Sequence, residues 1–383
     1  MRERNTCRCC GGTSLIEVLN LGSQPYANAF ITSDKLSTPE ATAPLILMSC
    51  QSCGMAQLRH IVDAVNLYHN YTFLTSSSKL MTEHFAGLMA DNVAAYVPPD
   101  GLVVEIGSND GTALASIQRP DVRRLGIDPA NNLAVISAER GVKTYIDFFD
   151  EISASEVRFL YGRADLIVAC NVLGHIDNLD SFCRGVNILL SSNGALIIEV
   201  PDVLRLIEGV EFDTVYHEHL SYFHVNPLIT LFKQHNLQVQ HVVEFPAIHG
   251  GSIRLTVRRG DSEYISNSTT NWNGFSDKCE NLKTSIRSWL MKQRDNTQTV
   301  WGYGAPAKGT VLLNYCGIDR SLLPVVIDST PTKQGKHVPG THQFIVKPCE
   351  LNSSVANSVL VLAWNHSQRF MKKNLLIVSL ADT

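Results

Sequence analysis

The chain has 383 residues, of which 44% are hydrophobic and 18% are charged, and this excludes a mainly disordered protein. At about 150 residues per domain, the length predicts two to three domains. The formal net charge of −4 excludes a global basic excess for holding a nucleic-acid backbone. No apolar run approaches the roughly 18 residues of a membrane span, and the start, MRERNTCRCC, has no apolar signal-peptide core. We therefore expect a cytoplasmic protein without a membrane or nucleic-acid partner.

Two CxxC pairs near the start of the chain indicate a metal site. They consist of Cys7 and Cys10, and of Cys50 and Cys53. Each turn directs two sulfurs at one point, and two turns complete the tetrahedral four-sulfur site that zinc prefers. Cys9 could replace Cys10 as a ligand, but the spacing favours Cys10. Four protein ligands leave no position for water, so we expect structural zinc; four reduced core cysteines or a redox pair are the alternatives.

A strand, a glycine-containing loop and a helix open the central part of the chain. The apolar, β-branched run 102–106 predicts a buried parallel strand, followed by the loop GSNDG at 107–111 and a helix from about Thr112. The loop is not GxGxxG. Glu105 and the acidic loop would repel a pyrophosphate but suit the sulfonium and ammonium of S-adenosylmethionine (SAM). The motif therefore favours SAM over NAD.

Further strands follow in an alternating β–α rhythm. We expect them at 124–128, 142–147, 165–171 and 195–200, with a late antiparallel strand at 251–258. Ligands gather outside the carboxyl ends of parallel strands, so the side chains there should converge on one cleft. The residues expected to bind the cofactor are Glu105, Gly107, Asn109, Asp110, Gly111, Asp128, Asp147, Phe148 and Asn171. Asp128 would meet ribose hydroxyls and Phe148 would lie beside adenine; a helix N-cap is the alternative role for Asp128.

A polar cluster follows the fifth of these strands. The segment 216–224 reads YHEHLSYFH. A His-x-His pair could bind metal, but HExxH is absent and no third ligand is obvious. Glutamate and tyrosine flank histidine here, as in a general base with an orienting carboxylate and a nearby hydroxyl. We therefore favour acid–base chemistry for this segment.

The C-terminal part contains a second strand–loop–helix unit. A loop at 267–274 and a helix at 275–294 precede a strand at 299–303, the loop GYGAPAKG and a helix through Leu313; strands at 325–328 and 359–363 follow. Asp328 lies 24 residues after Gly304, near where NAD enzymes carry an acid. An NAD-dependent oxidoreductase is therefore the alternative function. Lys308 and the loop amides could meet phosphates, or the loop could serve packing alone.

These motifs together resemble the SAM-dependent sugar C-methyltransferases, which act on nucleotide-linked 4-keto-deoxysugars. The resemblance covers nearly the whole chain and is carried by the two cysteine pairs, VVEIGSNDG, NVLGH, YHEHLSYF, HGGSIR and WGYGAPAKG. It implies an α/β protein with a zinc-binding domain at 1–70, a Rossmann-like SAM-binding domain at 71–265 and a second Rossmann-like domain at 266–383. The last of these would help to bind the nucleotide-sugar.

The resemblance also implies roles for single residues. His219 would be the catalytic base, supported by Tyr216, Glu218, His175 and Tyr71, with Tyr68 as the alternative to Tyr71. Substrate contacts would come from Tyr222, His249, Gly304 and Lys308. The chemistry agrees, since imidazole is the natural base for removing a proton next to a ketone near neutral pH. Family habit points to methylation at C3 of a dTDP-linked sugar; a zinc-stabilised binding protein without chemistry is the third hypothesis.

Overall fold

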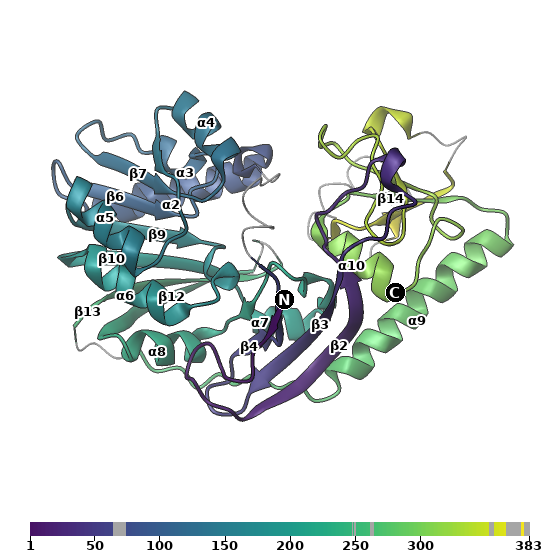
Figure 1. The fold of residues 1–383 in the computed structure, drawn as a ribbon, viewed down its shortest axis with the longest axis horizontal. Helices are drawn as coiled ribbons and strands as arrows, with labels where there is room; N and C mark the ends of the chain where they lie inside the picture. Colours follow the sequence, from purple (N-terminus) through teal and green to yellow (C-terminus); the bar gives the residue numbers. More distant parts are fainter. Residues whose placement is uncertain are drawn as a thin grey trace.

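The structure, a computed structural model, describes residues 1–63, 74–246, 248, 250–260, 264–351, 356–364 and 377–378. The central and C-terminal parts of the chain form two α/β bodies that face each other, and long strands of the N-terminal part run along their base (Figure 1). Among the described residues, every helix is too short or too polar to cross a membrane.

The central sheet has seven strands in the order β12-β13-β10-β9-β6-β7-β8. They are β6 (Leu102–Ile106), β7 (Arg123–Ile127), β8 (Lys143–Tyr145), β9 (Ala164–Cys170), β10 (Leu190–Pro201), β12 (Leu237–Phe245) and β13 (Ser252–Arg259). Strands β6 to β10 are parallel, whereas β13 is antiparallel to both β10 and β12. This confirms the predicted α/β fold. The strand order reverses between β6 and β9, which is where open α/β sheets bind ligands.

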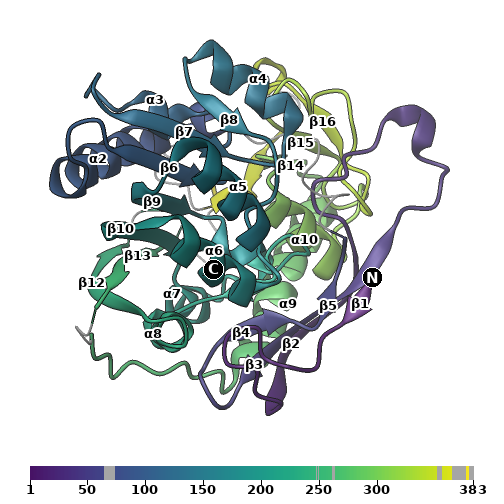
Figure 2. The ribbon, with the colours of Figure 1, turned by 60° about the vertical axis from the view of Figure 1, so that its left-hand side comes forward.

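Helices cover both faces of this sheet (Figure 2). They are α2 (Lys79–Tyr96), α3 (Thr112–Ala115), α4 (Asn131–Glu139), α5 (Glu151–Tyr161), α6 (Leu179–Leu189) and α8 (Val225–Lys233). The helix α7 (Val203–Glu208) packs instead in a core shared by the N-terminal and C-terminal parts. Successive side chains of β6 pack into the hydrophobic cores on opposite faces of the sheet. Val104 packs with residues of α5, α6 and α8, whereas Val103 packs with residues of α2 and α3. The strand is buried on both faces, which explains its continuous apolar sequence.

The N-terminal part forms a four-stranded sheet in the order β11-β4-β3-β2. Its strands are β2 (Leu15–Pro25), β3 (Thr42–Cys50), β4 (Ala56–Leu58) and β11 (Ser221–Tyr222). A short pair, β1 (Arg2–Glu3) with β5 (His60–Ile61), lies beside it. The edge strand β11 belongs to the polar YHEH segment, so the N-terminal sheet is paired directly with the candidate catalytic residues.

The C-terminal part forms a parallel sheet in the order β16-β15-β14-β17-β18. Its elements are α9 (Phe275–Asp295), β14 (Val300–Tyr303), α10 (Ala307–Tyr315), β15 (Val325–Ile327), β16 (Phe344–Val346), β17 (Ser358–Val361) and β18 (Ile377–Val378). The predicted second strand–loop–helix unit is thus confirmed. Leu19, Leu45 and Leu47 of the N-terminal sheet share one core with Phe275 and Leu290 of α9.

Candidate active site and metal centre

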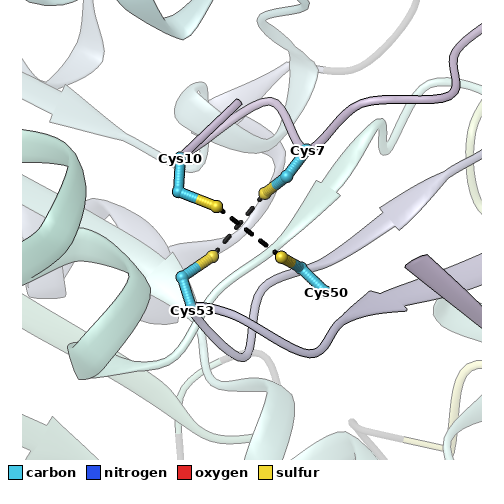
Figure 3. A group of neighbouring side chains, drawn as sticks. All are labelled: Cys7, Cys10, Cys50 and Cys53. Carbon is cyan, nitrogen blue, oxygen red and sulfur yellow. Dashed lines mark hydrogen bonds between the residues drawn. The ribbon is translucent and has the colours of Figure 1, made fainter. Parts of the chain in front are cut away.

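Four cysteine sulfurs converge at one end of the N-terminal sheet (Figure 3). The Sγ atoms of Cys7, Cys10, Cys50 and Cys53 all lie within 4.8 Å of one another. Two of the distances, Cys7 to Cys53 and Cys10 to Cys50, are 3.6 Å. A tetrahedral zinc with Zn–S bonds of about 2.3 Å requires sulfurs roughly 3.8 Å apart, so this donor set fits zinc.

Cys9 takes no part in this group. Its Sγ donates to the carbonyl of Pro227 at 3.0 Å, outside the four-sulfur cluster. Gly54, just after the second pair, has φ +78°, and its amide donates to the carbonyl of Cys50 at 2.9 Å. This left-handed turn folds the pair back on itself. The structure therefore places Cys10 and not Cys9 among the zinc ligands.

A cleft of about 1250 Å³ joins the central sheet, the YHEH segment and the C-terminal glycine loop. Its lining contains many of the residues singled out in the sequence: Glu105, Gly107, Asn109, Asp128, Asp147, Phe148, Asn171, His175, Tyr216, His219, Gly304 and Lys308. Three segments far apart in the sequence therefore contribute to one cavity. Tyr71 and His249 lie outside the described residues.

The end of the cleft at β6 and β9 fits the cofactor. Two buried oxygens, Oε2 of Glu105 and Oδ1 of Asn171, have no hydrogen-bond partner within the described part of the chain. Burial raises the pKa of Glu105 well above its usual value, and the carboxylates of Asp128 and Asp110 add to this effect. A ligand that carries positive charge and hydroxyl donors would satisfy both oxygens and favour the ionised carboxylate, which suits SAM.

Asp128 directly follows β7, and the N-cap position of α4 is occupied by Ala130 and not by Asp128. Asp128 lines the cleft, and its two oxygens accept from the amides of Asn109 and Ala130, each at 2.9 Å. Gly107 shapes the same loop, since it has φ +69° and an added Cβ would lie 2.8 Å from the side chain of Val172. The loop is therefore fixed closely against the turn that follows β9.

Asp110 and Gly111 do not reach the cleft. The carboxylate of Asp110 is buried and accepts from the hydroxyl of Thr112 at 2.6 Å and from the amide of Ser76 at 3.1 Å. Gly111 packs so closely that an added Cβ would lie 2.6 Å from the Oγ of Ser137. The structure places both residues in the framework of the loop, because successive side chains of a tight turn point in different directions.

His219 is held in one tautomer. Its Nδ1 lies 3.1 Å from the carbonyl of Thr214, and because a carbonyl only accepts, Nδ1 carries the proton. Its Nε2 then carries the lone pair, which accepts from the hydroxyl of Tyr216 at 2.7 Å. Nε2 is therefore the atom that can accept a proton from a substrate.

His175 lies against this base. The two imidazole rings have centroids 5.0 Å apart in an edge-to-face arrangement. Burial lowers the pKa of His175 to about 4, so this ring is neutral near pH 7. A neutral imidazole can donate one hydrogen bond to an oxygen that becomes negative without competing for the substrate's proton.

Glu218 was expected to orient His219, and its recorded hydrogen bond is to Asn28. Its Oε1 accepts from the side-chain amide of Asn28 at 2.7 Å. The Thr214 carbonyl, and not Glu218, accepts from Nδ1 of His219 and orients that ring. Burial raises the pKa of Glu218 to about 7, against the opposing effects of Asn28 and Lys333. Asn28 could not be predicted as a partner, since it is 190 residues from Glu218.

Two further residues carry polar groups into the C-terminal side of the cleft. The Nζ of Lys308 lies 4.5 Å from the centroid of the Trp364 ring and has no hydrogen-bond partner among the described residues. Lys333, which the sequence analysis missed, donates to the carbonyl of Ala305 at 2.8 Å. Tyr222, in contrast, lines an adjoining cavity of about 50 Å³, which shares His175 and His219 with the cleft. Its hydroxyl donates to Thr214 at 3.4 Å.

Comparisons with known proteins agree with this division of the chain. Three family models match it: a zinc binding domain over residues 7–68, a methyltransferase domain over 81–242 and a C-methyltransferase C-terminal domain over 247–379. The C-methyltransferase NovU of Streptomyces niveus is 32% identical over 384 residues, which cover 96% of this chain and 91% of that protein.

Solved structures of methyltransferases resemble the central part. A SAM-dependent methyltransferase from Clostridium acetobutylicum has 12% identity and a TM-score of 0.38, covering 47% of this chain and 92% of its own. Geranyl diphosphate C-methyltransferase from Streptomyces coelicolor A3(2) has 11% identity and a TM-score of 0.39, covering 47% of this chain and 80% of its own.

Proposed function

The chain belongs to the family of SAM-dependent C-methyltransferases that carry a zinc-binding N-terminal domain, and on this premise we propose that it methylates a nucleotide-linked 4-keto-deoxysugar. The methylated atom would be the carbon next to the ketone, C3 of a dTDP-linked sugar by family habit. The observation that carries the proposal is the position of His219, whose Nε2 belongs to a cleft shared with the cofactor end and the C-terminal loop.

Carbon becomes a nucleophile only when a proton next to the carbonyl is removed. In our proposal Nε2 of His219 accepts that proton, and its electron pair moves into an enolate. The Thr214 carbonyl accepts from Nδ1–H and so stabilises the imidazolium that results. His175 and Tyr216 would donate hydrogen bonds to the enolate oxygen. When bound, SAM supplies the methyl group from its sulfonium; the proton on His219 then leaves to solvent.

The C-terminal side of the cleft supports a substrate with negative charge. Lys308 and Lys333 both line it, and Lys308 directly follows the first residue of α10. A helix N-terminus next to a lysine suits a phosphate group. A diphosphate placed here would leave the attached sugar to extend toward His219. This arrangement favours a nucleotide-sugar over a free ketone.

We propose the boundaries 1–70, 71–265 and 266–383 for the three domains. The central boundary is supported by β13, which ends at Arg259 and pairs with β10 and β12 of the central sheet. The C-terminal domain would then begin with the loop before α9.

The proposal can be tested with a set of nucleotide-linked 4-keto-sugars in D₂O. The protein should exchange the hydrogen next to the ketone without SAM, and should form a methylated product with SAM. His219→Asn should abolish both reactions while SAM affinity stays nearly unchanged, and His241→Asn, at an exposed position on β12, should behave as the wild type. Methyl transfer by His219→Asn at a near-normal rate would discard the assignment, and NAD reduction would support the oxidoreductase instead.

A further inference from the structure

Arg8 lies within the first zinc-binding turn, yet its side chain extends toward the catalytic segments. The side chain has no exposed surface. Its Nη1 donates to the carbonyl of Leu58 at 2.9 Å and to the carbonyl of Leu220 at 3.2 Å. Its Nε donates to the carboxylate of Asp177 at 3.0 Å. One guanidinium thus contacts three separate segments of the chain.

Two of these acceptors belong to the segments that carry the catalytic histidines. Leu220 directly follows His219, and Asp177 is two residues after His175. The same two segments are joined by a hydrogen bond from the amide of Leu220 to the carbonyl of Gly174 at 2.8 Å. The guanidinium therefore links both histidine segments through Asp177 and Leu220, which also line the cleft.

The metal site fixes the turn from which this side chain starts. Cys7 and Cys10 flank Arg8 and provide two of the four sulfurs. The amide of Arg8 donates to Oε1 of Gln57 at 2.8 Å, and Gln57 is the residue of β4 that pairs with Ser221 of β11. A bound zinc ion would thus hold the Arg8 backbone against the strand that follows the catalytic base.

The chemistry of Arg8 indicates that it fixes the positions of its neighbours and adds little to the stability of the fold. Burying a guanidinium is costly, and a buried ion pair is often no more stabilising than well-packed apolar side chains. Its planar donors, however, fix the positions of several acceptors at once. Asp177 also pairs with Arg2 and Arg4, so it keeps cationic partners if Arg8 is replaced.

We propose that Arg8 is a positioning residue that couples the zinc site to the geometry of His219 and His175. This inference rests on the proposed function, because it takes His219 as the base. The zinc ion is then required for proton abstraction as well as for the stability of the N-terminal sheet, although it lies outside the cleft.

The test compares Arg8→Met with Arg8→Lys and with the matched control Arg4→Met. Arg4 also pairs with Asp177, at 3.4 Å, but its side chain is 25% exposed. Each variant is assayed for zinc per chain, SAM affinity, deuterium exchange next to the ketone, kcat and KM. We expect Arg8→Met to keep its zinc and its SAM affinity while exchange and kcat fall roughly tenfold to a hundredfold, with KM little changed.

Arg8→Lys should recover part of the lost rate, and Arg4→Met should match the wild type. A merely structural role predicts instead that the folded fraction falls while kcat per folded chain stays constant. Exchange by folded, zinc-loaded Arg8→Met at the wild-type rate would overturn the inference. If the wild type itself exchanges none of the ketosugars, it is the proposed function that fails.

A second measurement covers the case in which Arg8→Met does not fold. The wild-type protein is treated with increasing chelator, and exchange, SAM affinity and bound zinc are followed together. Exchange should decline in proportion to zinc while the remaining chains still bind SAM. Exchange that persists after the zinc has been removed would contradict the coupling.

Discussion

The carbonyl of Thr214 determines what His219 can do. A backbone carbonyl accepts but never donates, so it fixes the proton on Nδ1 and leaves Nε2 as the basic atom facing the cleft. Tyr216 already donates to that atom at 2.7 Å. A substrate ketone could take over this hydroxyl as its own donor, which would free Nε2 at the moment when it is needed.

The buried carboxyl of Glu218 lowers the free energy of unfolding by an amount that depends on pH. Burial raises its pKa from 4.5 to about 7, so folding is favoured by protonation of this group and loses that contribution as pH rises through about 7. The difference corresponds to at most roughly 3 kcal/mol. We expect Glu218→Gln to have about wild-type stability near pH 4 and to become more stable than the wild type above pH 7.

Urea unfolding of both proteins across this pH range tests the prediction. The difference in the free energy of unfolding between Glu218→Gln and the wild type should grow between pH 4.5 and about 7. Asn28→Ala removes the hydrogen bond that opposes the rise in the pKa of Glu218. The Glu218 carboxyl of this variant should therefore stay protonated up to a higher pH than in the wild type. A difference that is the same at every pH would show that the carboxyl does not titrate as described.

At the scale of elements, the N-terminal sheet combines two sources of stability. One end carries the four-sulfur site, and the strands β2 and β3 bury leucines against α9. The zinc end packs against the core of the central body through Cys7, Cys50 and Met55, and structural zinc contributes roughly 10–16 kcal/mol to small modules of this kind. The zinc end should therefore open first when the metal is lost.

Cys10→Ser is expected to lose the zinc ion, whereas Cys9→Ser should keep it, since the Cys9 thiol contacts Pro227 instead. Zinc per chain, measured on the purified variants, separates the two. Hydrogen exchange should then show β4 and β11 losing protection before the central sheet does. The prediction is wrong if Cys9→Ser loses the metal, or if all three sheets lose protection together.

The elements also show what could be predicted from the sequence. Strands β6, β7, β9 and β14 were placed within a residue or two, because a buried parallel strand leaves a continuous apolar run. Strand β12 was missed, since it lies at the edge of the central sheet and seven of its nine residues are exposed or partly exposed. Its apolar residues alternate only in part with polar ones, which gives a weak signal.

The candidate site was predicted where a motif is local and missed where it depends on distant pairing. The cysteine pairs and YHEH are short segments whose spacing is visible in the sequence. The contacts of Asn28 with Glu218, and of Arg8 with Leu220, span 190 and 212 residues. No periodicity records such contacts, and Asp110 was misplaced because a loop sequence does not show which way each side chain points.

At the scale of the whole molecule, the two α/β bodies face each other across the cleft, with the N-terminal strands at their base (Figure 1). The central body supplies the cofactor end, and the C-terminal body supplies Lys308 and Lys333. The N-terminal sheet touches both, through β11 on one side and the α9 core on the other. In the proposed function, cofactor and substrate would be held by different bodies, and their affinities should respond to different substitutions.

Lys308→Met tests this separation. The ammonium of Lys308 is buried without a hydrogen-bond partner among the described residues, and the residue lines the cleft, so we expect it to bind the substrate diphosphate. A hydrogen bond to a charged group contributes about 1.5–3 kcal/mol, so the variant should raise KM for the nucleotide-sugar roughly tenfold to a hundredfold. SAM affinity should stay unchanged, because the residues at the cofactor end are untouched. Lys292→Met, at an exposed position on α9, is the matched control for lost charge. If Lys308→Met instead weakens SAM and leaves the KM of the sugar intact, the two ligands are arranged in the cleft in the opposite order to the one proposed.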